Sequence, residues 1–219
     1  MSTTSIVLAG GRGSRLGREK YAESVAGRSL IERVIERLGP ISAEILVVIS
    51  QRQSKASFAS YKGARTVVDL HPGRGPLAGI YSGLTHSSSF NNVVVGCDMP
   101  FLNRDLLRCM IGLVPGFDVV MPRIGDYTEP LHAVYTKQCL PAMKGLIEQG
   151  HRKIGDLFNL VRVRYVEREE IEFFDPEHVS FFNVNTREDL ERARALAARE
   201  ALKTGDPRRS ESGRRHDIR

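Results

Sequence analysis

The sequence predicts an α/β fold: a single-domain, three-layer sandwich with a mostly parallel sheet. Short apolar runs alternate with amphipathic segments of helical length along the chain, which is typical of such folds. The apolar runs are nearly continuous, as in strands that are covered on both faces. The chain has 219 residues, of which 41% are hydrophobic, enough for one sizeable core. We assign residues 1–202 to this domain.

The apolar runs and the helix signals give the expected order of elements. The expected strands are residues 5–9, 44–50, 66–68, 92–97, 118–121, 131–135, 162–167 and 180–183. The first helix should begin after Ser29, which can form a capping box with Glu32, and should end at Gly39-Pro40. Further helices should begin at or just after Pro76, Asn103, Lys137 and Thr186, the last with Asp189 in a capping arrangement.

The net charge of +6 is concentrated at one end of the chain. Residues 203–219 hold six basic and three acidic side chains, so they contribute +3 and leave +3 for the rest. This segment has few apolar residues, and we expect a disordered tail that is either a solvated appendage or a binding segment. The body lacks aromatic interleaving and any RNA-recognition motif, so nucleic acid is not an expected partner.

Cysteine usage and the amino-terminal segment indicate a cytoplasmic protein. Cys97, Cys109 and Cys139 are isolated, without the spacing of a zinc site or a disulfide framework, and are expected to be reduced. The first apolar stretch, residues 6–9, is too short for a signal peptide or a membrane span. We therefore expect no membrane partner.

The loop after the first strand indicates phosphate binding. Residues 6–17 run from an apolar strand into a loop with four glycines and two arginines, and Lys20 follows. Glycines let phosphates approach backbone N–H groups, and the cations neutralise charge. The spacing fits neither a Walker A loop nor a dinucleotide-binding fingerprint. A βα loop without a ligand is the alternative.

Two carboxylates stand at expected strand ends. Asp98 follows the apolar run of residues 93–97, where open α/β sheets bind ligands, and one carboxylate suits Mg²⁺, which keeps several waters. Asp98 could instead cap a turn. Asp69 follows residues 66–68 and could likewise be a solvated turn residue. His132, on an expected strand, is interpreted as structural.

Five motifs resemble those of the molybdenum cofactor guanylyltransferase family, within the nucleotidyltransferases of Rossmann-like fold. They occur in the family's order and span residues 6 to about 195. The motifs are Leu8-Ala9-Gly10-Gly11-x-x-Ser14-Arg15-Leu16-Gly17-x-x-Lys20, Gly75-Pro76-Leu77-Ala78-Gly79-Ile80, Cys97-Asp98-Met99-Pro100-Phe101, Pro130-Leu131-x-Ala133-Val134-Tyr135 and Phe182-Asn183-Val184-Asn185-Thr186-x-Glu188-Asp189-Leu190.

This resemblance implies a Mg²⁺-dependent enzyme that transfers GMP from GTP to the terminal phosphate of molybdopterin and releases pyrophosphate. It implies Asp98 as the metal ligand, with Lys20 and Arg15 beside it in catalysis. The nucleotide would be bound by Leu8, Ala9, Gly10, Gly11, Lys20, Asp69 and Asp98, and the pterin acceptor by Asn183 and Asn185. Expected partners are GTP and molybdopterin or Mo-molybdopterin, with cofactor-biosynthesis proteins or apo-molybdoenzymes as further candidates.

The resemblance leaves alternatives open. Family members often carry an asparagine where this chain reads Ile49-Ser50-Gln51-Arg52, so one base or ribose contact is unassigned, and Ser50 or Gln51 could supply it. Cytidylyltransferases and sugar-phosphate nucleotidyltransferases share the fold, and the Leu-Ala-Gly-Gly form of the loop favours the guanylyl branch. A non-catalytic nucleotide-binding module is a further alternative, against which Lys20 and Asp98 argue.

Overall fold

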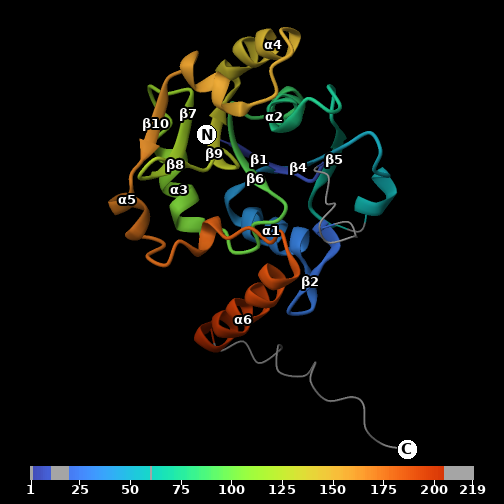
Figure 1. Cartoon of the computed structure of the whole chain (residues 1–219), viewed down its shortest axis with the longest axis vertical. Helices are drawn as coiled ribbons and strands as arrows, with labels where there is room; N and C mark the ends of the chain where they lie inside the picture. Colours follow the sequence, from blue (N-terminus) through green and yellow to red (C-terminus); the bar gives the residue numbers. More distant parts are fainter. Residues whose placement is uncertain (1, 11–19, 60, 205–219) are drawn as a thin grey trace, which may run out of the picture.

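A central sheet lies between two layers of helices in the computed structural model, which describes residues 2–10, 20–59 and 61–204 (Figure 1). The eight-stranded sheet has the order β10-β7-β9-β6-β1-β4-β5, with β8 beside β7. Its strands are β1 (Thr3–Leu8), β4 (Glu44–Ile49), β5 (Arg65–Val68), β6 (Asn91–Gly96), β7 (Val119–Ile124), β8 (Tyr127–Thr128), β9 (His132–Thr136) and β10 (Val163–Val166).

The sheet is mostly parallel, as predicted. Strands β5, β4, β1 and β6 pair in parallel, as do β7 and β10. Within this sheet, as far as the structure describes it, only the pairs made by β9 and β8 are antiparallel. The predicted fold class is therefore confirmed.

The helices form the two outer layers. Helices α2 (Gly75–His86) and α4 (Leu140–Glu148) cover one face of the sheet, and we call this the α2 face. Helices α1 (Leu30–Leu38), α3 (Arg104–Gly112) and α5 (Arg168–Glu172) cover the other, which we call the α1 face. The long α6 (Arg187–Thr204) packs outside this second layer with Leu30 and Phe101 (Figure 1).

Helix α2 lies close to β1 because two of its residues have no side chain. A Cβ atom at Gly83 would lie 2.5 Å from Cγ2 of Ile6, and one at Gly79 would lie 3.4 Å from Cδ2 of Leu8. These glycines therefore serve helix packing, and they bring the amino-terminal end of α2 over the end of β1.

The predicted helix caps are present. Ser29 and Glu32 form the capping box of α1, and the Asn103 side chain accepts the N–H groups of Asp105 and Leu106. At α6, the Asp189 carboxylate accepts the Thr186 N–H at 2.9 Å. Short polar side chains at these positions satisfy N–H groups that a helix leaves unpaired.

Seven of the eight predicted strands are confirmed, and the prediction of a strand at residues 180–183 is wrong. That segment contains the 3₁₀ helix η6 (Val179–Phe181). The buried carboxylate of Asp175 accepts the N–H groups of Val179 at 3.0 Å and Ser180 at 2.8 Å. These bonds satisfy the backbone locally, so the segment does not need a strand partner.

Several short elements were not predicted. They are the hairpin of β2 (Ser24–Val25) and β3 (Arg28–Ser29), β8, α5 and the 3₁₀ helices η1 (Lys20–Ala22), η2 (Gly39–Ile41), η3 (Lys55–Phe58), η4 (Lys137–Cys139) and η5 (Ile154–Asn159). None of the helices described is both long enough and apolar enough to cross a membrane. Residues 205–219, most of the predicted tail, lie outside the described residues.

Candidate active site

The order of the strands predicts a ligand site at the carboxyl end of β1. From β1 the chain continues to β4 and β5 on one side, and it then returns to form β6 on the other side of β1. In open α/β sheets, ligands bind at such a reversal, outside the carboxyl ends of the strands. Residues that follow β1, β4, β5 and β6 therefore border one site.

The alternation of side chains along β4 and β5 indicates on which face of the sheet Ser50 and Asp69 lie. Val47 and Ile49 of β4 belong to the core on the α1 face, whereas Val48 belongs to the core on the α2 face. The ladder continues past the strand ends, because Asp69 donates its N–H to the Ile49 carbonyl at 2.8 Å. Ser50 and Asp69 are therefore expected to follow Val48 onto the α2 face.

Asp98 is held at the end of β6 by its backbone and by the lack of a side chain at Gly96. The Asp98 carboxylate lies over Gly96, where a Cβ atom would be 2.4 Å from Oδ1. Leu8 of β1 pairs with Gly96, so this carboxylate lies beside the end of β1. The Asp98 carbonyl accepts the Val184 N–H at 3.0 Å, which draws the segment around Asn183 to the same edge.

Asp69 is half-buried, and its carboxylate is held by hydrogen bonds. Its Oδ1 accepts the His71 N–H at 3.0 Å and the Ser82 hydroxyl at 2.9 Å, so α2 orients the carboxylate. Ser82 is fully buried, which makes this orientation rigid. The other oxygen, Oδ2, accepts no hydrogen bond from the residues that the structure describes, and it is available to a ligand.

The position of the missing family asparagine is occupied by a small network. The Gln53 side chain accepts the Ser50 N–H at 2.9 Å and the Ser50 hydroxyl at 3.1 Å. It donates its amide to the Ala9 carbonyl at 3.1 Å. Gly10 approaches the same place, since a Cβ atom there would lie 3.1 Å from the Ser50 nitrogen.

The expected acceptor residues lie on a segment that is anchored to the sheet. Asn183 donates its side-chain amide to the Phe181 carbonyl at 3.1 Å, and Asn185 donates its N–H to Asp189 at 3.0 Å. The Phe181 ring meets the His132 ring edge-on, with the centroids 4.8 Å apart. The structure thus places Asn183 near Asp98, with its amide turned back onto its own backbone.

His132 is fully buried in β9, in agreement with a structural role. Neither ring nitrogen has a hydrogen-bond partner among the described residues. Burial in this apolar setting lowers the pKa of His132 to about 4, because the charged form would be desolvated.

The structure describes the residues on either side of the glycine-rich loop that we expect to bind phosphate. Leu8, Ala9 and Gly10 lie at the end of β1, whereas Gly11 and Arg15 are outside the described residues. The backbone of Lys20 begins η1, and the next residue, Tyr21, packs against Phe58 with the ring centroids 4.4 Å apart.

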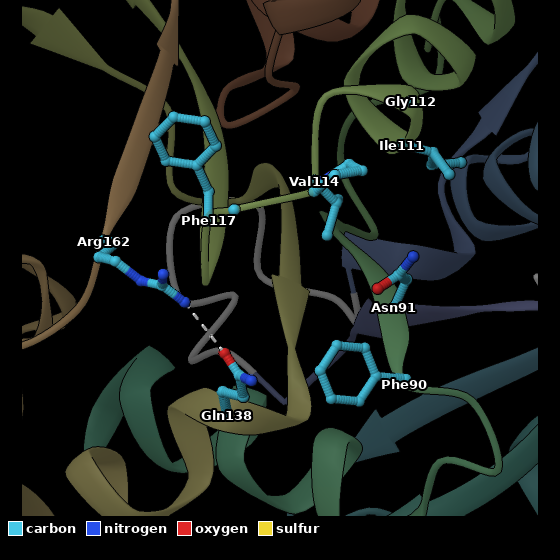
Figure 2. A pocket seen from close by; sticks show the side chains of 10 residues that line it. Phe90, Asn91, Ile111, Gly112, Val114, Phe117, Gln138 and Arg162 are labelled. Carbon is cyan, nitrogen blue, oxygen red and sulfur yellow. Dashed lines mark hydrogen bonds between the residues drawn. The ribbon is translucent and has the colours of Figure 1, made fainter.

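A hollow lies at the other end of the strands, where β6 begins and β9 ends (Figure 2). It is lined mainly by apolar side chains, among them Phe90, Val114 and Phe117, and Arg162 donates to Gln138 across it at 3.4 Å (Figure 2). It contains none of the predicted site residues.

Comparison with known proteins agrees with the fold. A family model described as the MobA-like NTP transferase domain matches residues 5–165, which is more than half of the chain. The chain belongs to this family. The match includes the ends of β1, β4, β5 and β6, and it stops before Asn183 and Asn185.

Relatives of this MobA-like chain carry a common name. A protein of Desulfosudis oleivorans named molybdenum cofactor guanylyltransferase is 33% identical over 93% of this chain and 98% of its own length. A protein of Pelotomaculum thermopropionicum, named as a probable enzyme of the same kind, is 38% identical over 90% of this chain and 94% of its own.

A solved structure has the same fold. The molybdopterin-guanine dinucleotide biosynthesis protein A of Archaeoglobus fulgidus has a TM-score of 0.79 and 35% sequence identity. The alignment covers 90% of this chain and 99% of that one.

Three site residues were not identified from the sequence of this MobA-like chain. Ser82 and Gln53 act through other residues, and neither follows a strand end directly, so spacing does not single them out. Gly96 could have been found, because a glycine at the last position of a buried strand, two residues before a carboxylate, indicates close approach.

Proposed function

We propose that this protein transfers GMP from GTP to the terminal phosphate of molybdopterin and releases pyrophosphate. The observation that carries the proposal is that the neighbouring strands β5, β4, β1 and β6 end at Asp69, Ser50, Gly10 and Asp98, on one side of the sheet. The relatives named molybdenum cofactor guanylyltransferase support the choice of substrates.

The proposed site has two halves with different tasks. The ends of β4 and β5 supply Ser50 and Asp69, neutral and anionic acceptors that suit the N–H donors of guanine. The segment with Asn183 and Asn185 is joined to Asp98 through the Val184 N–H, and these two residues are the proposed contacts of the pterin. The Asn183 amide, which donates to the Phe181 carbonyl, would have to turn to reach it. The α-phosphate of the nucleotide is then expected near Asp98, between the two halves.

The reaction needs alignment more than proton transfer. A terminal phosphate is already an anionic nucleophile at neutral pH, so no protein base has to activate it. Backbone N–H groups at Gly10 and the side chains of Lys20 and Arg15 are proposed to bind the triphosphate and to stabilise charge as pyrophosphate leaves.

Asp98 is the proposed ligand of Mg²⁺. The described residues contain no group of three or more metal-ligating side chains. A single carboxylate at a strand end nevertheless fits this ion, which completes its shell with waters and substrate phosphates. When bound, Mg²⁺ neutralises negative charge on the phosphates.

The test is a turnover assay with each nucleotide. The full chain is incubated with Mg²⁺, molybdopterin and one of GTP, CTP, ATP or UTP, and pyrophosphate release is followed, with the acceptor omitted as control. We expect acceptor-dependent release with GTP. Preference for CTP would assign the chain to cytidylyl transfer, and nucleotide binding without turnover would indicate a non-catalytic module.

In the cell, Mo-molybdopterin is an alternative acceptor, and cofactor-biosynthesis proteins or apo-molybdoenzymes are proposed recipients of the product. A pull-down with an apo-molybdoenzyme, with and without product formation, tests this last step.

A further inference from the structure

Gln53 connects the residues that follow β1 with those that follow β4, although it belongs to none of the recognised motifs. Its side chain spans from the Ala9 carbonyl, after β1, to the Ser50 N–H and hydroxyl, after β4. We propose that Gln53 is a positioning residue that determines the hydrogen-bond polarity of Ser50 and thereby contributes to the choice of nucleotide base. This inference rests on the proposed function.

The orientation of the Gln53 amide follows from its backbone partners. The Ser50 N–H can only donate and the Ala9 carbonyl can only accept, so the amide oxygen must face Ser50 and the amide nitrogen must face Ala9. An amide turned by 180° would oppose both partners. The Ser50 hydroxyl, 3.1 Å from this oxygen, must therefore be the donor of that bond.

A hydroxyl has one proton, and in Ser50 that proton is committed to Gln53. The remaining lone pairs of the Ser50 oxygen can only accept a hydrogen bond. Ser50 follows β4 directly, and Asp69 follows the adjacent β5 in the same register, with Ile49 opposite Val68. Neighbouring strands are about 4.8 Å apart, so two acceptors stand side by side on the α2 face.

Two adjacent acceptors match one base best. Guanine presents two neighbouring donors, N1–H and the N2 amine. Adenine and cytosine each present one amine beside a ring nitrogen that is an acceptor, and uracil presents one N–H between two carbonyls. Each of these would place an acceptor against Ser50 or Asp69. A Ser50 hydroxyl that could rotate would lose this discrimination, because it could donate to the wrong base.

The amide nitrogen of Gln53 holds the residues that lead into the glycine-rich loop. Its bond to the Ala9 carbonyl fixes the last residues before Gly11, and Gly10 packs against the Ser50 backbone. Phe58, on η3 of the same connection, packs on Tyr21 at the far end of that loop. The segment after β4 therefore contacts both ends of the loop, and Gln53 supplies its polar contact.

Two substitutions of Gln53 separate its bond to Ser50 from its bond to Ala9. Gln53→Glu keeps an oxygen that accepts from Ser50 but cannot donate to Ala9. Gln53→Met has a similar length and removes both interactions. We measure kcat and KM for GTP, ATP and CTP with molybdopterin, and nucleotide affinity by calorimetry without the acceptor, so that the binding result does not depend on turnover.

We expect both variants to lower kcat/KM for all nucleotides, because both lose the bond to Ala9. Only Gln53→Met should also reduce the GTP/ATP and GTP/CTP ratios, by about fivefold to thirtyfold, the scale of one hydrogen bond. In Gln53→Glu the ratios should stay within about twofold of the wild type. Ser50→Ala should reduce them as Gln53→Met does, and the double variant should lose no more than either.

A merely structural role of Gln53 predicts another pattern. It would change stability and overall rate equally in both variants and leave the base ratios unaltered, and that result would overturn the inference. Equal ratios in Ser50→Ala and the wild type would overturn it too. Gln138→Met is the matched control, because Gln138 is exposed at the other end of the strands (Figure 2). Circular dichroism and melting temperature verify folding.

Failure of the proposed function is a separate result. A wild-type protein that does not prefer GTP, in turnover or in binding, would contradict guanylyl transfer whatever the variants do. A wild-type protein that prefers GTP, with ratios that Gln53→Met does not change, would leave the function standing and reject only the role of Gln53.

Discussion

The hydroxyl of Ser82 lies 2.9 Å from Oδ1 of Asp69 and ties the end of β5 to the middle of α2. The same carboxylate oxygen accepts the His71 N–H at 3.0 Å, so a backbone donor already occupies Oδ1. The single proton of the Ser82 hydroxyl is shared between Asp69 and the Ala78 carbonyl, which lies 2.8 Å away. A base that enters the site therefore meets Oδ2. The structure thus leaves one oxygen of Asp69 for a donor of the base, and a second acceptor has to come from another residue.

Asp69→Ala should erode the preference for GTP more than it lowers the maximal rate. Loss of a hydrogen bond to a charged acceptor costs about 1.5 to 3 kcal/mol, which corresponds to roughly tenfold to a few hundredfold in the GTP/CTP ratio. A competition assay among the four nucleotides measures it. Asp105→Ala is the control, since Asp105 is exposed on α3. An unaltered ratio would remove Asp69 from base recognition.

Ser82→Ala should have a smaller effect on selectivity and a clear effect on stability. The Leu70 N–H donates to the Ser82 hydroxyl at 2.9 Å and would lose its partner. Loss of this partly buried hydrogen bond should cost about 1 kcal/mol, measurable as a lower urea midpoint with unchanged slope. Ser82→Thr keeps the hydroxyl, and it should retain more of the GTP preference than Ser82→Ala.

Asp98→Asn should abolish turnover while the fold is kept. The substitution preserves size and the backbone carbonyl that accepts from Val184, but it removes the charge proposed to hold Mg²⁺. We expect at least a hundredfold loss of kcat, with a melting temperature close to that of the wild type. Asp105→Asn serves as the matched control. Turnover near the wild-type level in Asp98→Asn would reject the metal role.

Gly96→Ala tests the placement of the Asp98 carboxylate without removing it. The new methyl group would lie 2.4 Å from Oδ1, so the carboxylate must move. We expect a loss of kcat of tenfold or more, since small displacements of aligned groups are costly. Gly112→Ala, where a Cβ atom meets nothing within 4 Å, should leave kcat unchanged. Equal activity of the two variants would show that the Asp98 position is not critical.

His132 should make the protein less stable as the pH falls from about 6.5 to about 4. The folded protein holds this imidazole neutral with a pKa of about 4, whereas the unfolded chain takes up a proton near the ordinary value of 6.5. Below 6.5 the unfolded state therefore binds more protons, and the free energy of unfolding drops by roughly 1 to 3 kcal/mol across this range.

His132→Phe should flatten this part of the pH profile, measured by urea unfolding at several pH values. Glu44→Gln serves as the comparison, because Glu44 affects stability in a lower pH range than His132. Burial raises the pKa of Glu44, but hydrogen bonds from Arg65, Ser88 and Thr4 outweigh burial and lower it to about 2. The stability that Glu44 contributes is present above about 4.5 and is lost as the pH falls toward 2. The fall above pH 5 should persist in Glu44→Gln and disappear in His132→Phe.

Local signals predicted most of the fold because they depend on neighbours in the chain. The capping box of Ser29 and Glu32 and the strand before Asp98 depend on spacing and on apolar runs, which are visible in a sequence. The segment at residues 180–183 was mispredicted because its apolar pattern resembles a strand, while the decisive partner is the carboxylate of Asp175. A side chain that satisfies backbone groups competes with a sheet and leaves the hydrophobic pattern unchanged.

The sequence by itself determined the class of fold, the order of its strands along the chain and the residues that end them, since these follow from periodicity and from the chemistry of glycine and aspartate. Only the tertiary structure decided which of those residues face one another. The sheet order 5-4-1-6 brings Asp69, Ser50, Gly10 and Asp98 to one edge, and Ser82 and Gln53 then orient two of them. Hydrogen-bond polarity depends on partners distant in sequence, and spacing along the chain does not encode them.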